Sequence, residues 1–161
     1  MQPASPRVIE LFNDALTFEL TVTNTYFLHA RMLDNWGLSK LGKVFYELSI
    51  DEMKDADDII NRILMFDGHP NVQKLNAITV GESAEEMLRL ALESEKAAVA
   101  QFNAWAKECH ELGDHASAAI FEEMARDEEK HADWFESQLD AIDRVGVENY
   151  LAQQIEAGEA P

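Results

Sequence analysis

The chain has 161 residues, of which 31 are Asp or Glu and 13 are Lys or Arg, so its formal net charge at pH 7 is −18. This balance argues against a nucleic-acid partner, because phosphate binding needs a positive face. A hydrophobic fraction of 47% excludes a disordered chain. The length suits a single domain over residues 1–161, and the acidity indicates either a solvated surface or a field that attracts cations.

Cysteine content and apolar runs bear on the compartment. Cys109 is the only cysteine, so no intramolecular disulfide can form, which is typical of a reducing compartment. The first twenty residues lack the basic segment, apolar run and small-residue cleavage site of a signal peptide. No stretch reaches the roughly 18 apolar residues of a membrane span. The sequence therefore predicts a cytoplasmic protein without a membrane partner.

Glycine and proline divide the first half of the chain into segments that are long enough for helices rather than strands. Ser5 is placed to be an N-cap, with Pro6 at the first helical position. Gly37 can end this helix in the left-handed conformation. We expect Ser39 to cap a second helix that ends near Gly68.

The second half begins with a segment, residues 67–82, that lacks apolar periodicity and is predicted to be a long connection. Ser83 and Glu86 then form the S-x-x-E pattern of a capping box, in which each side chain satisfies a free amide of the first turn. This pattern predicts a third helix that runs to Gly113.

Two further helices follow. Asp114 is placed to cap a fourth helix that reaches about Arg144, and a short fifth helix is expected from Val147 to Ala157. Four long helices with two short turns and one long middle connection describe an all-α fold. We expect a four-helix bundle built from two antiparallel hairpins joined by a crossover, with the short fifth helix at its C-terminal end.

Acidic residues interrupt the apolar stripe of each long helix near its middle, where a bundle is normally apolar. A carboxylate that is buried without a partner costs several kcal/mol, so several of them in one layer need cations or protons. A metal site accounts for all of them together. The interrupting residues are Glu19, Glu52 with Asp55, Glu95, and Glu128 with His131.

The two halves of the sequence also correspond to each other at a shift of 76 residues, which places Glu19 on Glu95 and Gly37 on Gly113. Each half supplies one Glu and then a Glu-x-x-(Asp or His) pair, whose i, i+3 spacing puts both side chains on one helix face. This is the ligand arrangement of di-iron carboxylate bundles. Six such ligands can hold two ions, with two carboxylates bridging them.

Several stretches of the chain resemble the bacterioferritins, the haem-containing branch of the ferritins. The stretches are EL at 19–20, YFLHARM at 26–32, NWGL at 35–38, SIDEM at 49–53, DEE at 127–129, His131-x-x-Trp134, and NYL at 149–151. The resemblance covers almost the whole chain. It implies one subunit of a hollow 24-subunit shell that oxidises Fe(II) and stores a ferric mineral. In such a shell, we expect the net negative charge to gather iron.

The resemblance also implies roles for individual residues. It implies that the ligands of a di-iron ferroxidase centre are Glu19, Glu52, Glu95, Glu128 and His131, with Glu52 and Glu128 bridging the ions. Tyr26 lies two turns after Glu19 on the same helix face. Tyr26 is expected to hydrogen-bond a ligand carboxylate or to donate an electron. The alternative is a buried tyrosine with one hydrogen bond.

One position departs from the family pattern, since Asp55 stands where the first Glu-x-x-His motif has its histidine. Asp is shorter than His and adds negative charge, although carboxylate oxygen does ligate iron. In one interpretation Asp55 still binds the first iron, directly or through water. In the other interpretation that iron site is weak, and the subunit is a catalytically weak shell component that coassembles with a second, active bacterioferritin subunit.

A rubrerythrin-like peroxidase is disfavoured, because one cysteine cannot supply a rubredoxin segment.

Met53 gives a second functional signal. It lies about 100° around the helix from Glu52 and therefore on the outside of the bundle. With Tyr46, and with Leu20 and Phe27 of the first helix, it forms a second apolar seam that indicates a subunit interface. The resemblance implies that Met53 ligates haem b, shared by two subunits across a two-fold axis, with these three side chains as the walls of the haem pocket.

The haem would carry electrons, from a ferredoxin for example, to release iron. A purely packed dimer contact is the alternative.

Overall fold

The computed structural model describes residues 1–156, which form five helices and no strand. The helices are α1 (Pro6–Asn35), α2 (Ser39–Met65), α3 (Ala84–Glu111), α4 (His115–Val145) and α5 (Val147–Ala152). The predicted all-α class is confirmed. Within the described range, no helix combines the length and the apolarity that crossing a membrane requires.

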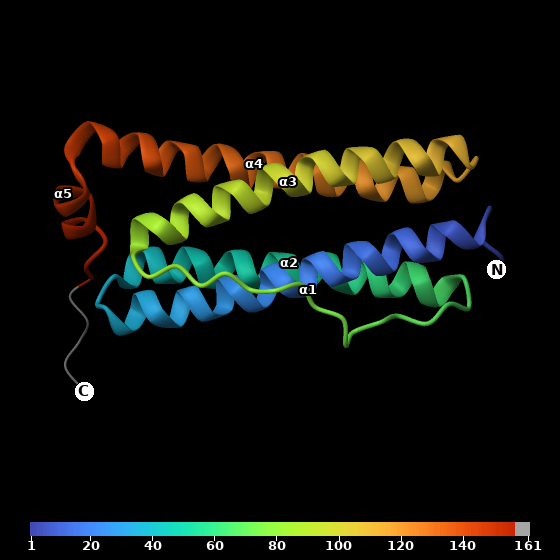
Figure 1. Cartoon of the computed structure of the whole chain (residues 1–161), viewed down its shortest axis with the longest axis horizontal. Helices are drawn as coiled ribbons and strands as arrows, with labels where there is room; N and C mark the ends of the chain where they lie inside the picture. The colour runs from blue at the N-terminus through green and yellow to red at the C-terminus, as the bar shows by residue number, and fades with distance from the viewer. Residues whose placement is uncertain (157–161) are drawn as a thin grey trace.

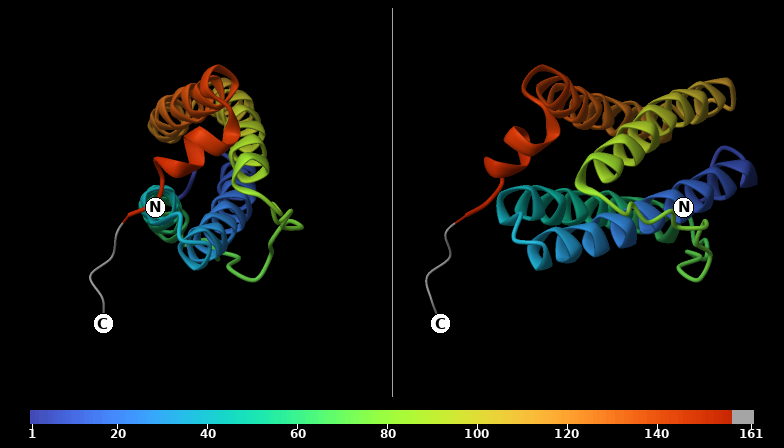
Figure 2. Two further views of the ribbon diagram at one scale, coloured as in Figure 1. Left: turned by 90° about the vertical axis from the view of Figure 1, so that its left-hand side faces the viewer. Right: turned by 60° about the vertical axis from the view of Figure 1, so that its left-hand side comes forward.

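The four long helices form a bundle of two antiparallel hairpins (Figure 1). α1 packs along α2, and α3 packs along α4. The segment between α2 and α3 runs back along the bundle, so α3 starts at the same end as α2 (Figure 1). The short α5 lies across that end of the bundle, where it contacts α4 (Figure 2).

The two hairpin turns have the same construction. Gly37 and Gly113 both adopt the left-handed region, with φ of 80° and 79°. In each turn, the N–H of the residue after the glycine donates to the carbonyl five residues earlier at 2.9 Å. This is the Schellman ending, which needs a residue without a Cβ penalty at positive φ. The turns repeat at the same 76-residue shift as the acidic residues.

Three predicted helix caps are present. The side chains of Ser5, Ser83 and Asp114 each accept a hydrogen bond from an amide of the first turn that follows. The prediction for Ser39 is wrong, because Leu38 is the N-cap of α2 and no side chain caps that helix. The Gly37 turn leads directly into α2 and leaves Ser39 already inside the helix.

The predicted end of the fifth helix is also corrected. α5 ends at Ala152, whereas the expected end, Ala157, lies outside the described residues. The carbonyl of Gln154 accepts a hydrogen bond from the amide of Lys40 at 3.1 Å. The chain after α5 is therefore turned towards the start of α2 and is tied to it.

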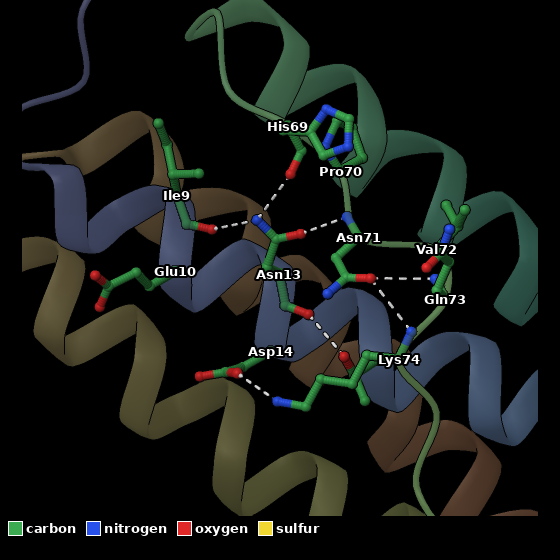
Figure 3. A pocket seen from close by; sticks show the side chains of 11 residues that line it. Ile9, Glu10, Asn13, Asp14, His69, Pro70, Asn71, Val72, Gln73 and Lys74 are labelled. Atoms are coloured by element: carbon green, nitrogen blue, oxygen red, sulfur yellow. Dashed lines mark hydrogen bonds and ion pairs between the residues drawn. The ribbon is translucent and has the colours of Figure 1, made fainter.

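The crossover, residues 66–83, has no helix of its own but is held by side chains. Asn13 of α1 donates to the carbonyl of His69 at 3.3 Å and accepts from the amide of Asn71 at 2.7 Å (Figure 3). The Asn71 side chain in turn accepts from the amides of Gln73 and Lys74. These bonds fix the path of the predicted connection across the surface of α1.

The hydrophobic core is divided into two clusters along the bundle. One cluster contains Phe12 and Phe121, whose stacked rings have centroids 4.3 Å apart. The other contains Phe45 and Phe135, with centroids 5.7 Å apart.

Candidate metal centre

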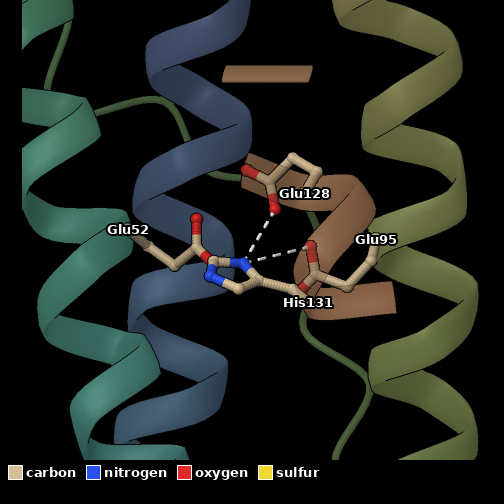
Figure 4. A group of neighbouring side chains, drawn as sticks. All are labelled: Glu52, Glu95, Glu128 and His131. Carbon is tan, nitrogen blue, oxygen red and sulfur yellow. Dashed lines mark hydrogen bonds and ion pairs between the residues drawn. The ribbon is translucent and has the colours of Figure 1, made fainter. Parts of the chain in front are cut away.

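Two groups of side chains inside the bundle bring potential metal ligands together, and each group has ligand atoms that all lie within 4.8 Å of one another. All four long helices contribute to them. The first group is Glu52, Glu95, Glu128 and His131 (Figure 4), and the second is Glu19, Glu52, Asp55 and Glu128. We call these six side chains the acid layer. All six are residues that the sequence analysis selects.

The two groups share Glu52 and Glu128. These two residues start the two i, i+3 pairs of the internal repeat, and they face each other from α2 and α4. A carboxylate that belongs to two neighbouring ligand groups is placed to bridge two ions. The arrangement therefore has the layout of a dinuclear site with two bridging carboxylates.

The glutamates of the acid layer are almost completely buried, with exposed fractions of 0 to 1%. Within residues 1–156, both carboxylate oxygens of Glu19 and of Glu52, and one of Glu128, have no hydrogen-bond partner. Buried oxygens in this state are costly unless a cation or a proton satisfies them. Their number and convergence fit a pair of metal ions.

His131 occupies the position of a counter-cation in the first group (Figure 4). Its Nδ1 lies 3.2 Å from Glu128 Oε2, 3.3 Å from Glu52 Oε1 and 4.0 Å from Glu95 Oε2. Burial lowers the pKa of His131, but the hydrogen bond to Glu128 and the nearby carboxylate of Glu52 outweigh burial and raise this pKa to about 10. The metal-free protein therefore holds an imidazolium at a position that the sequence predicts to be a metal ligand.

Burial acts in the opposite sense on several carboxyl groups of the acid layer and favours their protonated form. Burial, followed by the charges of neighbouring carboxylates, raises the pKa of Glu19 well above its usual range. Burial also raises the pKa of Glu52, and that of Glu95 strongly. For Asp55, burial and the charges of Glu52 and Glu128 raise the pKa to about 7. Protons or cations can neutralise this layer, and the two compete.

Tyr26 is joined directly to the acid layer. Its hydroxyl, which is buried, donates a hydrogen bond to the carboxylate of Glu95. Burial and the charge of Glu95 raise the pKa of Tyr26 well above its usual range, so the phenol stays protonated. Tyr26 also lines a cavity of about 280 Å³ between α1, α3 and the crossover. The hydrogen bond predicted for Tyr26 is present and orients a candidate ligand.

An acidic hollow that sequence reasoning does not single out opens beside Asp55. It has a volume of about 430 Å³ and lies between α2 and α4. Its acidic residues are Asp55, Asp58, Glu123 and Asp127. Asp55 and Asp58 are three residues apart on α2, and Glu123 and Asp127 are four residues apart on α4. This helix spacing is the signal that could have identified the hollow. The hollow gives Asp55, unlike the buried glutamates, contact with solvent.

The predicted apolar seam is present on the outside of α1 and α2. Met53 is 51% exposed, Phe27 49% and Tyr46 39%, while Leu20 is partly buried. The rings of Phe27 and Tyr46 have centroids 6.1 Å apart, and the Arg31 guanidinium lies over both rings. Large exposed apolar side chains gathered in this way are typical of an interaction surface.

Comparisons with known proteins agree with this architecture. The profile of the ferritin-like domain matches residues 9–145. The chain is 43% identical over 145 residues to a bacterioferritin of Brucella melitensis, covering 90% of each chain. It is 42% identical to a bacterioferritin of Rhodobacter capsulatus over 89% of each chain, and 42% identical to one of Streptomyces coelicolor over 94% of this chain and 90% of that protein. The chain belongs to the ferritin-like family and, within it, to the bacterioferritins.

Proposed function

We propose that this chain is the subunit of an iron-storage shell and that its acid layer oxidises Fe(II) to Fe(III). Membership of the bacterioferritin family supports iron storage. The observation that carries the ferroxidase proposal is the pair of ligand groups that share Glu52 and Glu128. The product would be deposited inside a shell of 24 such subunits.

The acid layer has the donors that ferrous iron needs. One ion would be held by Glu52, Glu95, Glu128 and His131, and the other by Glu19, Glu52, Asp55 and Glu128. The first group has the carboxylate and imidazole donors of di-iron helical bundles, and the second has the Asp55 carboxylate in place of the imidazole. Each bound ferrous ion supplies one electron to dioxygen or peroxide.

The protein's own groups prepare this chemistry. His131 and the raised-pKa carboxyl groups give up protons when cations enter, so the layer exchanges protons for metal with a small change in buried charge. Tyr26 holds Glu95 in place through its hydroxyl. The acidic hollow beside Asp55 draws cations from solvent towards the second ligand group.

We assign a second cofactor, haem b, to the apolar seam. Met53 offers an exposed thioether, which is a known axial ligand of haem iron, and Phe27 and Tyr46 flank it with aromatic rings. A haem bound there would be shared by two copies of the chain across a two-fold axis. When bound, it supplies electron transfer for the release of iron, with a ferredoxin as the candidate reductant.

The alternative is a catalytically weak shell subunit that coassembles with an active bacterioferritin subunit. The substitution of Asp55 for the family histidine motivates it. Against it, a carboxylate oxygen of Asp55 lies in the second ligand group, within 4.8 Å of the ligand atoms of Glu19, Glu52 and Glu128. We therefore favour a complete, asymmetric centre.

Anaerobic Fe(II) titration of the metal-free homomeric protein tests the proposal. We expect saturation at two tightly bound ions per subunit, followed by oxygen consumption that tracks the bound iron when air is admitted. Glu128→Gln should weaken both ions because Glu128 belongs to both groups. Saturation at one ion, with negligible oxygen uptake, would instead support the weak-subunit alternative. Light scattering after size exclusion measures the mass of the shell.

A further inference from the structure

A pair of imidazoles lies at the turn between α3 and α4, at the end of the bundle away from α5 (Figure 1). His110 is in the last turn of α3, and His115 is the first residue of α4. Their Nδ1 atoms are 2.9 Å apart, and both side chains are exposed. The left-handed turn at Gly113 folds the chain back and brings the two rings together. Neither residue belongs to the acid layer.

Glu122, two turns into α4, favours one tautomer of His110. Its Oε1 lies 2.8 Å from Nε2 of His110. An ionised carboxylate only accepts hydrogen bonds, so Nε2 of His110 carries the proton. In the neutral ring the lone pair is then on Nδ1, which faces His115. The hydrogen bond between the two rings is therefore donated by Nδ1 of His115.

The separation of the two nitrogens matches a metal site. Two nitrogen ligands with bonds of about 2.05 Å are about 2.9 Å apart when they subtend 90° at the metal, and about 3.3 Å apart in a tetrahedral site. The observed 2.9 Å fits the cis edge of a square-planar or octahedral ion. To ligate, the His115 ring moves its proton from Nδ1 to Nε2, with no net change in charge.

We propose that His110 and His115 form a mononuclear site for a divalent transition-metal ion of the Cu(II) or Ni(II) type, with both Nδ1 atoms as ligands and water in the other positions. Glu122 acts as a positioning residue. Its hydrogen bond to Nε2 of His110 reproduces the carboxylate–histidine–metal arrangement that orients ligands in many sites. The net charge of −18 favours a cation at this exposed position.

Electron paramagnetic resonance with Cu(II) tests the site directly. One equivalent of Cu(II) per subunit is added to the metal-free full-length protein. We expect a tetragonal spectrum with superhyperfine splitting from two imidazole nitrogens. The acid layer offers one imidazole, His131, so copper bound there cannot give the two-nitrogen pattern. A wild-type spectrum without that pattern would overturn the proposal.

Variants then assign the ligands. His110→Ala and His115→Ala should each remove the two-nitrogen pattern, whereas His69→Ala, which removes an exposed histidine of the crossover, should leave it unchanged. Retention of the pattern in either of the first two variants would contradict the assignment. Light scattering confirms that all variants keep the wild-type mass.

The role of Glu122 has its own readout. Glu122→Gln should keep the two-nitrogen pattern but weaken Cu(II) binding by roughly 10- to 100-fold, measured by competition with a chelator. Unchanged affinity would show that the carboxylate does not position His110.

Discussion

Nδ1 of His131 lies 3.3 Å from Oε1 of Glu52, so an imidazole of α4 closes the acid layer against a carboxylate of α2. The pKa of His131 is about 10, so this histidine is a counter-cation to the carboxylates in the metal-free protein. In the metal-bound protein it is a candidate ligand. The switch between these two states requires the loss of a proton. We therefore expect metal binding at this position to depend on pH.

Proton release on metal binding is the first prediction. A group with a raised pKa keeps its proton until the pH exceeds its pKa. Zn²⁺ binding at pH 6 should therefore displace protons from Asp55 and from His131. As the pH rises through about 7, the release should fall because Asp55 has already ionised, while His131 still contributes up to about pH 10. Calorimetry in buffers of different ionisation enthalpy measures the number of protons.

Asp55→Asn is the matched control for this experiment, since it removes the group that titrates near pH 7 and keeps its size. In this variant the fall in proton release per bound ion between pH 6 and 8 should be smaller than in the wild type. A wild-type release that is constant over that range would mean that Asp55 ionises outside it.

Much of the acid layer could be predicted because its spacing is local. An i, i+3 pair such as Glu128 and His131 shares a helix face whatever the rest of the fold does. The internal repeat then places Glu19 and Glu95 at equivalent depths in the two hairpins. The assignment of a shared pair, Glu52 and Glu128, follows from side chains that meet across the bundle, and the sequence reaches it only through the family resemblance.

The features that sequence reasoning missed depend on tertiary contacts. The chain after α5 is held by a hydrogen bond from the amide of Lys40 to the carbonyl of Gln154, more than 100 residues away. His110 and His115 are five residues apart, a spacing that no helix face brings together, and they meet because the turn at Gly113 reverses the chain. Neither contact leaves a periodic signal.

The second prediction concerns Asp55. Asp55→Ala should remove one ligand of the second group, and Fe(II) binding should then saturate at one tightly bound ion per subunit. Asp55→His should keep two ions and bind the second more tightly, because a longer, neutral ligand replaces a carboxylate in a layer that holds four glutamates. Anaerobic titration of the two variants beside the wild type decides this. Two equally tight ions in Asp55→Ala would show that Asp55 is not a ligand.

The third prediction concerns the seam. Met53→Leu keeps an apolar side chain of similar size but removes the thioether, so protein purified after haem supplementation should lose the Soret band of the wild type. Met65→Leu is the matched control, because Met65 is also an exposed methionine of α2, at 44% against 51% for Met53, and should change nothing. An unchanged Soret spectrum in Met53→Leu would leave the seam as a packed dimer contact.

The last prediction concerns the stability of the end of the bundle. Nη2 of Arg62 lies 3.1 Å from Oδ1 of Asp114, and the two side chains are only 12% and 8% exposed. The guanidinium also donates to Ser117 Oγ and lies over the ring of Phe66, with 4.5 Å from Cζ to the ring centroid. Asp114 is at the same time the N-cap of α4, accepting from the Ser117 amide at 3.0 Å. This ion pair therefore connects α2 to the beginning of α4.

Arg62→Met keeps an apolar stem but leaves the buried carboxylate without its cation, so we expect a loss of about 3 kcal/mol in the free energy of unfolding. Lys54→Met breaks the exposed pair with Asp51, in which the side chains are 70% and 51% exposed, and should cost less than about 1 kcal/mol. Denaturant unfolding of the metal-free proteins, followed by circular dichroism at equal subunit concentration, compares the two. If both variants lost the same small amount, Arg62 would contribute no more than an exposed ion pair, and the helix cap alone would stabilise the start of α4.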